Sequence, residues 1–344
     1  MLLTLLGVPA LRAQATAGWA IRSSSSADLW FHAVALTGYD AFGAVPLYQP
    51  GYAAKVRASR ETAGKGPTLL ERSAGEFHAA FSADQSFEIL HFLPVYFAAA
   101  DVEQMLDALD KVSSQGDRAA VEVAPAARFG AAVVASVLTT PQERATLARF
   151  VAAVREEWTH GYRAERAAQS AERDAALAAA ISTWAGRAGP AIAPALAALS
   201  LDGGIIIASP ALGPEGRLFS GRPDDRTDNI VAVSLALSPS AAGDPAWLAI
   251  REMYFPAARA ALMAAGAMPS GAGAAEQATG RAAARLAAAQ LSTRGEGLVT
   301  AYQGALLRVL GQPVPETPAE RAKAFESAYP LTEPAALVLR VGGN

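Results

Sequence analysis

The chain has 344 residues, which is long enough for one large core or two packed subdomains. Hydrophobic residues make up 52% of it and charged residues 18%, against about 25% charged in a typical soluble domain, so the composition excludes a disordered chain. The net charge of −3 argues against nucleic acid as a partner, because no broad basic surface can form. The absence of cysteine excludes disulfides, thiolate metal sites and cysteine nucleophiles.

The first fifteen residues have the pattern of a signal peptide. An apolar run over residues 1–11 is followed by Arg12 and by the sequence Ala13-Gln14-Ala15, which matches a small-residue cleavage site. We therefore expect cleavage after Ala15 and an exported, soluble protein in the periplasm or outside the cell. A buried N-terminal helix is the alternative. The run is shorter than the roughly 20 residues that cross a bilayer, and no membrane span is expected in the mature chain.

Residues 16–140 are expected to form a mostly helical N-terminal region, and residues 141–344 a second helical region that contains a small sheet. The serines at 23–26 offer an N-cap for an apolar helix that begins near Asp28 and ends near Gly38. Amphipathic or apolar segments follow at 52–62, 69–81, 86–92, 101–111 and 126–138.

The clearest periodic segment begins at Thr140, with Pro141 at the first helical position. Apolar side chains then recur at helical spacing towards Trp184, which predicts one long helix with a bend near Ser170. Two prolines, Pro190 and Pro194, are expected to end it.

The sheet signal lies in the middle of the chain, between residues 203 and 237. A β-branched run at 205–209 is followed by a turn at 213–216 and by a possible return strand at 217–220. The run 229–237 is typical of a buried strand. Helices are expected again at 244–266, 276–291, 298–310 and 318–328, before an apolar tail at 335–341. The predicted fold class is α+β, predominantly α-helical, with a small mixed or antiparallel sheet.

Most patterns of known catalytic or metal sites are absent. The four histidines are scattered among apolar neighbours and are expected to be core or helix-surface residues. The Asp-rich loop at 224–228 lacks the alternating spacing of a calcium loop and is interpreted as a solvated turn. There is no nucleophile elbow and no phosphate-binding loop.

One segment has a partial likeness to a metallopeptidase helix. Zinc peptidases use His-Glu-x-x-His, in which the two histidines share the metal and the Glu polarises its water. The corresponding segment is Arg251-Glu252-Met253-Tyr254-Phe255, which keeps the Glu and lacks both histidines. Glu276 follows at close to the spacing of a third, glutamate ligand. With the order of elements over residues 141–310, this part of the chain resembles the catalytic region of gluzincin-like metallopeptidases.

The resemblance implies a zincin-like scaffold without catalysis. Arginine has no lone pair and phenylalanine has no donor atom, so no metal and no cofactor are expected. Arg251 and Glu276 would form an ion pair at the former metal position, with Glu252 at the floor of a cleft. That cleft, with Tyr254 and Phe255 as further candidates, would bind a peptide or protein by strand addition.

Two other interpretations remain open. One is a helix-rich envelope or secreted binding protein that has no peptidase ancestry. In that case Arg251 and Glu252 lie on the solvated face of an amphipathic helix. An active hydrolase of an unfamiliar kind is less favoured, because the chain has few histidines and no cysteine.

Overall fold

The computed structural model describes residues 18–40, 46–221 and 228–332. The predicted signal peptide, most of the Asp-rich loop and the apolar tail lie outside the described residues. The described part is predominantly helical with one four-stranded mixed sheet, which confirms the predicted fold class.

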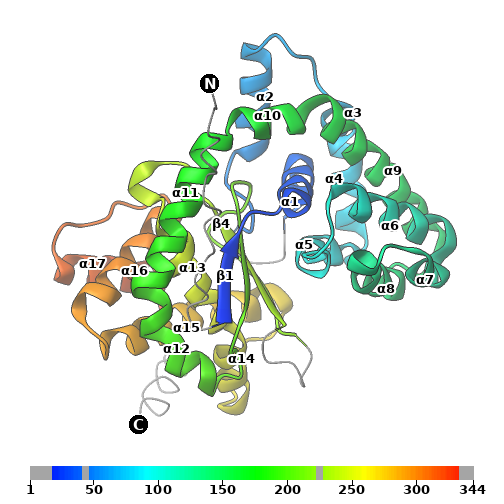
Figure 1. Ribbon diagram of the computed structural model, residues 1–344. Helices are drawn as coiled ribbons and strands as arrows, with labels where there is room; N and C mark the ends of the chain where they lie inside the picture. Colours follow the sequence, from blue (N-terminus) through cyan, green and yellow to red (C-terminus); the bar gives the residue numbers. More distant parts are fainter. Residues whose placement is uncertain (1–17, 41–45, 222–227, 333–344) are drawn as a thin grey trace, which may run out of the picture.

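The sheet lies between two helical layers (Figure 1). Its strands are β1 (Trp19–Arg22), β2 (Gly204–Ser209), β3 (Arg217–Phe219) and β4 (Asn229–Ser234), in the order β1-β2-β4-β3. The strands β1, β2 and β4 run parallel to one another, and β3 pairs antiparallel with β4 at one edge of the sheet.

Side chains of the central strands alternate between the two layers. On β2, Ile205 and Ile207 join the cluster formed by the N-terminal helices, whereas Ile206 joins the C-terminal cluster. On β4, Ala232 and Val231 divide in the same way. Successive residues of a strand point to opposite faces, so a continuous apolar run is what a sheet covered on both faces requires.

The first layer is built from the N-terminal helices. Trp30 lies at its centre, edge-on to Phe150 with ring centroids 5.3 Å apart. The helices are α1 (Ser25–Thr37), α2 (Tyr52–Thr62), α3 (Leu69–Arg72), α4 (Ala74–Ala83), α5 (Leu93–Tyr96), α6 (Val102–Gln115), α7 (Ala119–Glu122), α8 (Arg128–Val137) and α9 (Pro141–Glu157), with 3₁₀ turns at Gln85–His91, Gly116–Arg118 and Pro125–Ala127.

The predicted long helix is present but is longer and less regular than expected. It continues from α9 through a π-helical turn at Trp158–Tyr162 into α10 (Arg163–Ala168), and breaks at Gln169, beside the predicted bend. It then runs through α11 (Ser170–Thr183), a second π-helical turn and α12 (Gly189–Ala198). The expectation that prolines end it was wrong. Pro190 lies in the first turn of α12, where a missing N–H is tolerated, and Pro194 lies inside that helix.

This helical run passes from the first layer to the second (Figure 1). Leu147 and Val154 of α9 belong to the N-terminal cluster, whereas Trp184 belongs to the C-terminal one, together with Trp19 of β1. The predicted domain boundary at residue 140 stays a prediction. Along this helical run, the buried side chains pass from the N-terminal cluster to the C-terminal cluster well beyond residue 140.

The second layer contains the C-terminal helices. They are α13 (Asp244–Met253), α14 (Phe255–Ala264), α15 (Ala272–Ser292), α16 (Glu296–Val309) and α17 (Pro318–Ala328), preceded by a 3₁₀ turn at Pro239–Ala241. The single helix expected over 244–266 is two helices that meet at Tyr254. Pro256 explains the break, because it lacks the N–H that would bond to the carbonyl of Glu252.

Two features of the sheet differ from the sequence prediction. The strand β1 was not predicted, and β3 pairs with β4, which lies between it and β2. The turn at 213–216 therefore does not close a hairpin.

Within the described residues, no single helix combines the length and apolar character needed to cross a membrane. One sharply bent pair, Val102–Glu122 with Pro125–Val137, meets those criteria only when its two halves are taken together.

Candidate functional site

The segment singled out in the sequence lies at the end of α13, which packs against β4 and α16. Arg251 and Glu252 are both 3% exposed, so the interpretation as a solvated helix face is wrong. Side chains of adjacent helical residues do not face each other, yet the long Arg251 side chain curls back to its neighbour. Its Nε donates to Glu252 Oε1 at 2.7 Å, and its Nη2 donates to the same oxygen.

Glu252 lies directly against the backbone that leads into β3. A Cβ atom placed on Gly216 would come within 2.7 Å of the Glu252 Cγ, so the close approach depends on glycine at that position. Burial raises the pKa of Glu252, and the guanidinium of Arg251 opposes that shift. The same carboxylate raises the pKa of Arg251, although burial acts to lower it.

The predicted ion pair between Arg251 and Glu276 is not formed. Arg251 is committed to Glu252, whereas Glu276, on α15, has its Oε2 atom 3.6 Å from Arg259 Nη1 of α14. Packing of α14 against α15 brings Arg259 beside Glu276, which explains the exchange of partners. Burial raises the pKa of Glu276, and the nearby Glu215 carboxylate adds to that effect.

Although they are not paired, Arg251, Phe255 and Glu276 line one cavity of about 210 Å³. These are the positions that the resemblance suggested by the sequence would match to the three metal ligands of a gluzincin. Their convergence comes from α13, the start of α14 and the first turns of α15. The remaining lining residues are Pro46, Glu215, Gln277, Gly280, Arg281, Leu310, Gln312, Ala328 and Tyr329.

The other two candidates lie outside the residues described as lining this cavity. Glu252 is buried next to it. The hydroxyl of Tyr254 is buried without a hydrogen-bond partner among the described residues, and burial raises its pKa to about 12. Tyr254 is therefore a core residue at the junction of two helices.

The residues around the cavity do not fit a zinc ion. Of the three ligand positions, Glu276 alone carries a metal-ligand atom, whereas structural and catalytic zinc sites use three or four. Glu215 is already bonded to Arg217, whose Nη1 donates to Oε1 at 2.7 Å. Across the described ranges, no three His, Cys, Asp or Glu side chains converge so as to hold a metal ion.

The histidines agree with their interpretation as core and surface residues. His78 and His160 are exposed, and His32 and His91 are buried. His32 has both ring nitrogens engaged, at 2.9 Å from Tyr52 Oη and 2.9 Å from Glu157 Oε1.

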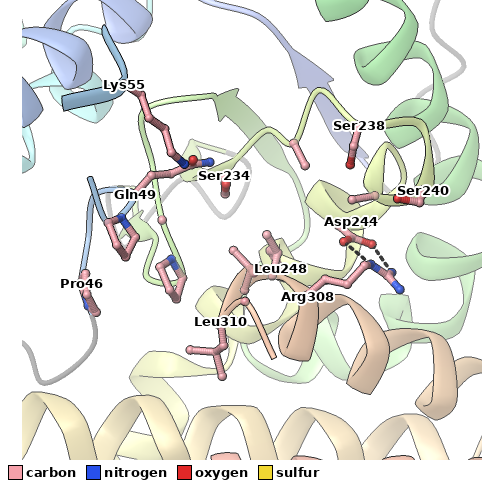
Figure 2. Close-up of a pocket in the computed structure, with 17 residues that line it drawn as sticks. Pro46, Gln49, Lys55, Ser234, Ser238, Ser240, Asp244, Leu248, Arg308 and Leu310 are labelled. Carbon is pink, nitrogen blue, oxygen red and sulfur yellow. Dashed lines mark hydrogen bonds and ion pairs between the residues drawn. The ribbon is translucent and has the colours of Figure 1, made fainter. Parts of the chain in front are cut away.

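A larger cavity was missed by the sequence analysis. It has a volume of about 660 Å³ and lies where β4 ends (Figure 2). Its walls include Lys55, Ser234 and the Asp244–Arg308 ion pair, in which Arg308 Nε donates to Asp244 Oδ2 at 2.8 Å. Asp244 was recognised only as a helix start, and no local pattern connects it with Lys55.

Comparison of the chain with protein-family models, with curated protein sequences and with solved structures finds no match. The functional argument therefore depends on the geometry of the two cavities.

Proposed function

We propose that this chain is an exported, non-catalytic binding protein with a zincin-like arrangement, and that the cavity beside Arg251 takes a segment of peptide. The observation that carries the proposal is the convergence of Arg251, Phe255 and Glu276 on one cavity. These residues were selected from sequence spacing alone. Glu252, at the position of the catalytic carboxylate, lies next to them.

The chemistry of the lining favours binding over hydrolysis. Hydrolysis by this class of site needs a metal-bound water, and Arg251 and Phe255 supply no ligand atom for the metal. A guanidinium, carboxylates and an aromatic ring can instead hold the amide groups and side chain of a bound segment.

The adjoining strand supports a peptide as the ligand. β3 is an edge strand with β4 as its one neighbour, and Glu215, two residues before β3, lines the cavity. In an antiparallel ladder, alternate residues direct their backbone groups away from the partner strand, where an extended peptide can pair with them.

Binding can be measured by fluorescence polarisation with a fluorescein-labelled digest of casein as a source of extended peptides. We expect saturable binding that weakens at least several-fold in Phe255→Ala and in Glu276→Gln. Glu103→Gln, a carboxylate on the exposed face of α6, is the matched control and should bind as the unaltered protein does. Equal binding by all four proteins would contradict the proposal.

The zincin-like arrangement has a separate test, which is to restore the missing ligands. In Arg251→His/Phe255→His, two imidazoles and Glu276 should bind about one zinc per chain, and Glu276→Gln in that background should remove it. Zinc content is measured by elemental analysis after dialysis, with circular dichroism as the check on folding. A folded double variant that holds no zinc would refute this arrangement.

The second candidate is a binding protein without peptidase ancestry, and the observation that favours it is the larger cavity at the end of β4. In that case ligand binding depends on the lining of that cavity. Substitutions at Phe255 and Glu276 then have no effect.

Export is part of the proposal and depends on the sequence of residues 1–15. Cleavage after Ala15 would leave Thr16 as the first residue and would keep β1, which begins at Trp19. N-terminal sequencing of the protein from its native host should therefore start near Thr16. An intact Met1 on cytoplasmic protein would contradict export.

A further inference from the structure

The cavity of about 660 Å³ adjoins a second one of about 330 Å³. Both are lined by Gln49, Lys55 and Ala236, so they form one cleft between α2 and the segment after β4. We call this the β4-end cleft. It lies outside the carboxyl ends of the parallel strands β2 and β4, which is where open α/β sheets commonly bind their ligands.

The charged groups of the cleft are paired, with one exception. Asp244 is bonded to Arg308, the carboxylate of Glu165 to Arg60, and the guanidinium of Arg173 to Asp28. These pairs leave no free carboxylate among the described lining residues.

Lys55 is the exception. Among the described lining residues, it is the charged side chain without a hydrogen bond or ion pair to another group. Its side chain is exposed, so its ammonium can meet an incoming anion at the mouth of the cleft, while the lining carboxylates Asp244 and Glu165 are engaged by arginines.

The polar groups are placed at the two ends of the larger cavity. Figure 2 shows Lys55, Gln49 and Ser234 gathered on one side, and the Asp244–Arg308 pair on the other. The apolar side chain of Leu248 lies between them, and Leu310 lies below in this view. A ligand that satisfies this lining has an anionic head, an apolar body and a polar far end.

We infer that the β4-end cleft is a binding site for an elongated organic anion. Its carboxylate or phosphate group lies against the ammonium of Lys55, and its body lies over Leu248 and Leu310. This site adjoins the cavity beside Arg251, with which it shares Pro46 and Leu310. Lys55 and Ala236 line the cleft and not that cavity, so substitutions at these two positions test the inference separately from the peptide proposal.

Isothermal titration of the full chain with three six-carbon probes tests the inference. Hexanoate and hexyl phosphate carry the two candidate head groups, and hexanol is the neutral control. We expect at least one of the two anions to bind saturably and more tightly than hexanol. The ranking of the two anions identifies the head group.

Two variants locate the site. Lys55→Gln should weaken binding of the anion about tenfold, the effect of losing one charge-assisted hydrogen bond. The matched control is Lys65→Gln, which removes the same charge from an exposed residue outside the cleft. Ala236→Trp, which fills the junction of the two cavities, should abolish binding while leaving the circular dichroism spectrum unchanged.

Several results would overturn the inference. One is the absence of saturable binding by either anion at millimolar concentration, and another is binding of hexanol as tight as that of the anions. Equal weakening in Lys55→Gln and Lys65→Gln would also reject it, because the effect would then reflect net charge alone. So would unchanged binding in a folded Ala236→Trp protein.

Discussion

Two buried charge clusters in this molecule differ in how completely their hydrogen bonds are satisfied. The Glu157 cluster, in the N-terminal layer, consists of Glu157, His32, Arg60 and Thr68. The Glu157 carboxylate lies 2.9 Å from His32 Nε2 and accepts from Thr68 Oγ1 at 2.6 Å, and from Arg60 at both of its oxygens. Those donors come from three separate parts of the chain, so the carboxylate ties them together.

The Arg251 cluster, in the C-terminal layer, consists of Arg251, Glu252, Glu276 and Tyr329. Its closest pair, Arg251 with Glu252, joins adjacent residues of one helix, so it does not connect that helix to another helix or strand. The pKa values of both carboxylates are raised by burial, whereas hydrogen bonds to His32, Arg60 and Thr68 overcome burial and lower the pKa of Glu157 to about 2.

The contrast indicates different roles. A buried carboxylate that accepts hydrogen bonds from several separate donors stabilises the fold. Carboxylates with raised pKa values at a cavity, as Glu276 is, or buried beside one, as Glu252 is, are typical of sites that bind or react. We therefore interpret the Glu157 cluster as structural and the Arg251 cluster as functional.

The largest expected effect is that of Glu157→Ala. Removing this carboxylate takes the acceptor away from His32 Nε2 and Thr68 Oγ1, whereas Arg60 keeps Glu71 and Glu165 as partners. We therefore expect a loss of about 3–4 kcal/mol in the free energy of unfolding. Urea denaturation measures it, with Glu103→Ala on the surface as a control that should change stability by less than about 0.5 kcal/mol. A loss below about 1 kcal/mol in Glu157→Ala would remove the structural half of the comparison.

The pH dependence of stability should report the same carboxylate. The pKa of Glu157 falls from 4.5 to about 2 on folding, so its stabilising contribution is present above pH 4.5 and is lost as the pH falls towards 2. The shift corresponds to about 3 kcal/mol. Glu157→Gln should lose less stability over this range than the unaltered protein does, as measured by urea denaturation at a series of pH values. Identical slopes for the two proteins would show that other groups dominate.

Arg251→Ala should cost somewhat less, about 2–3 kcal/mol at neutral pH. The variant leaves Glu252 buried without its cation, but this carboxyl group already has a raised pKa and can take up a proton. Because the folded state then binds that proton more tightly than the unfolded state, the cost should be smaller at pH 5 and grow towards pH 8. A cost that does not change with pH would show that Glu252 stays charged.

The sequence predicted the local parts of this fold and missed the long-range ones. Caps and periodicity predicted most helices well, as at Thr140, whose hydroxyl accepts from the Glu143 N–H and completes a capping box. The four-residue strand β1 was missed because its partner, β2, lies more than 180 residues away along the chain. Strand pairing at that distance leaves no local pattern.

The candidate site stays a prediction. Arg251, Phe255 and Glu276 were chosen from their spacing, and the fold places all three on one cavity, but the spacing did not identify the partners of the two charged residues. Pro256 breaks the helix between Arg251 and Phe255. Arg259, on the helix that follows the break, pairs with Glu276. The β4-end cleft left no signal, because its residues come from separate segments with unremarkable local sequences.

The smallest expected effect on stability is that of Glu276→Gln. Its side chain is 32% exposed and its partner Arg259 is 53% exposed, and ion pairs of that kind contribute little. We expect a change of less than about 0.5 kcal/mol in urea denaturation, while peptide binding weakens because the carboxylate at the cavity wall is lost. Stability and binding should thus separate at Glu276, whereas Glu157→Gln should impair stability and leave the affinity for peptide unchanged. If Glu276→Gln instead destabilised the protein as much as Arg251→Ala does, the Arg251 cluster would be structural like the first one, and the distinction between the two would fail.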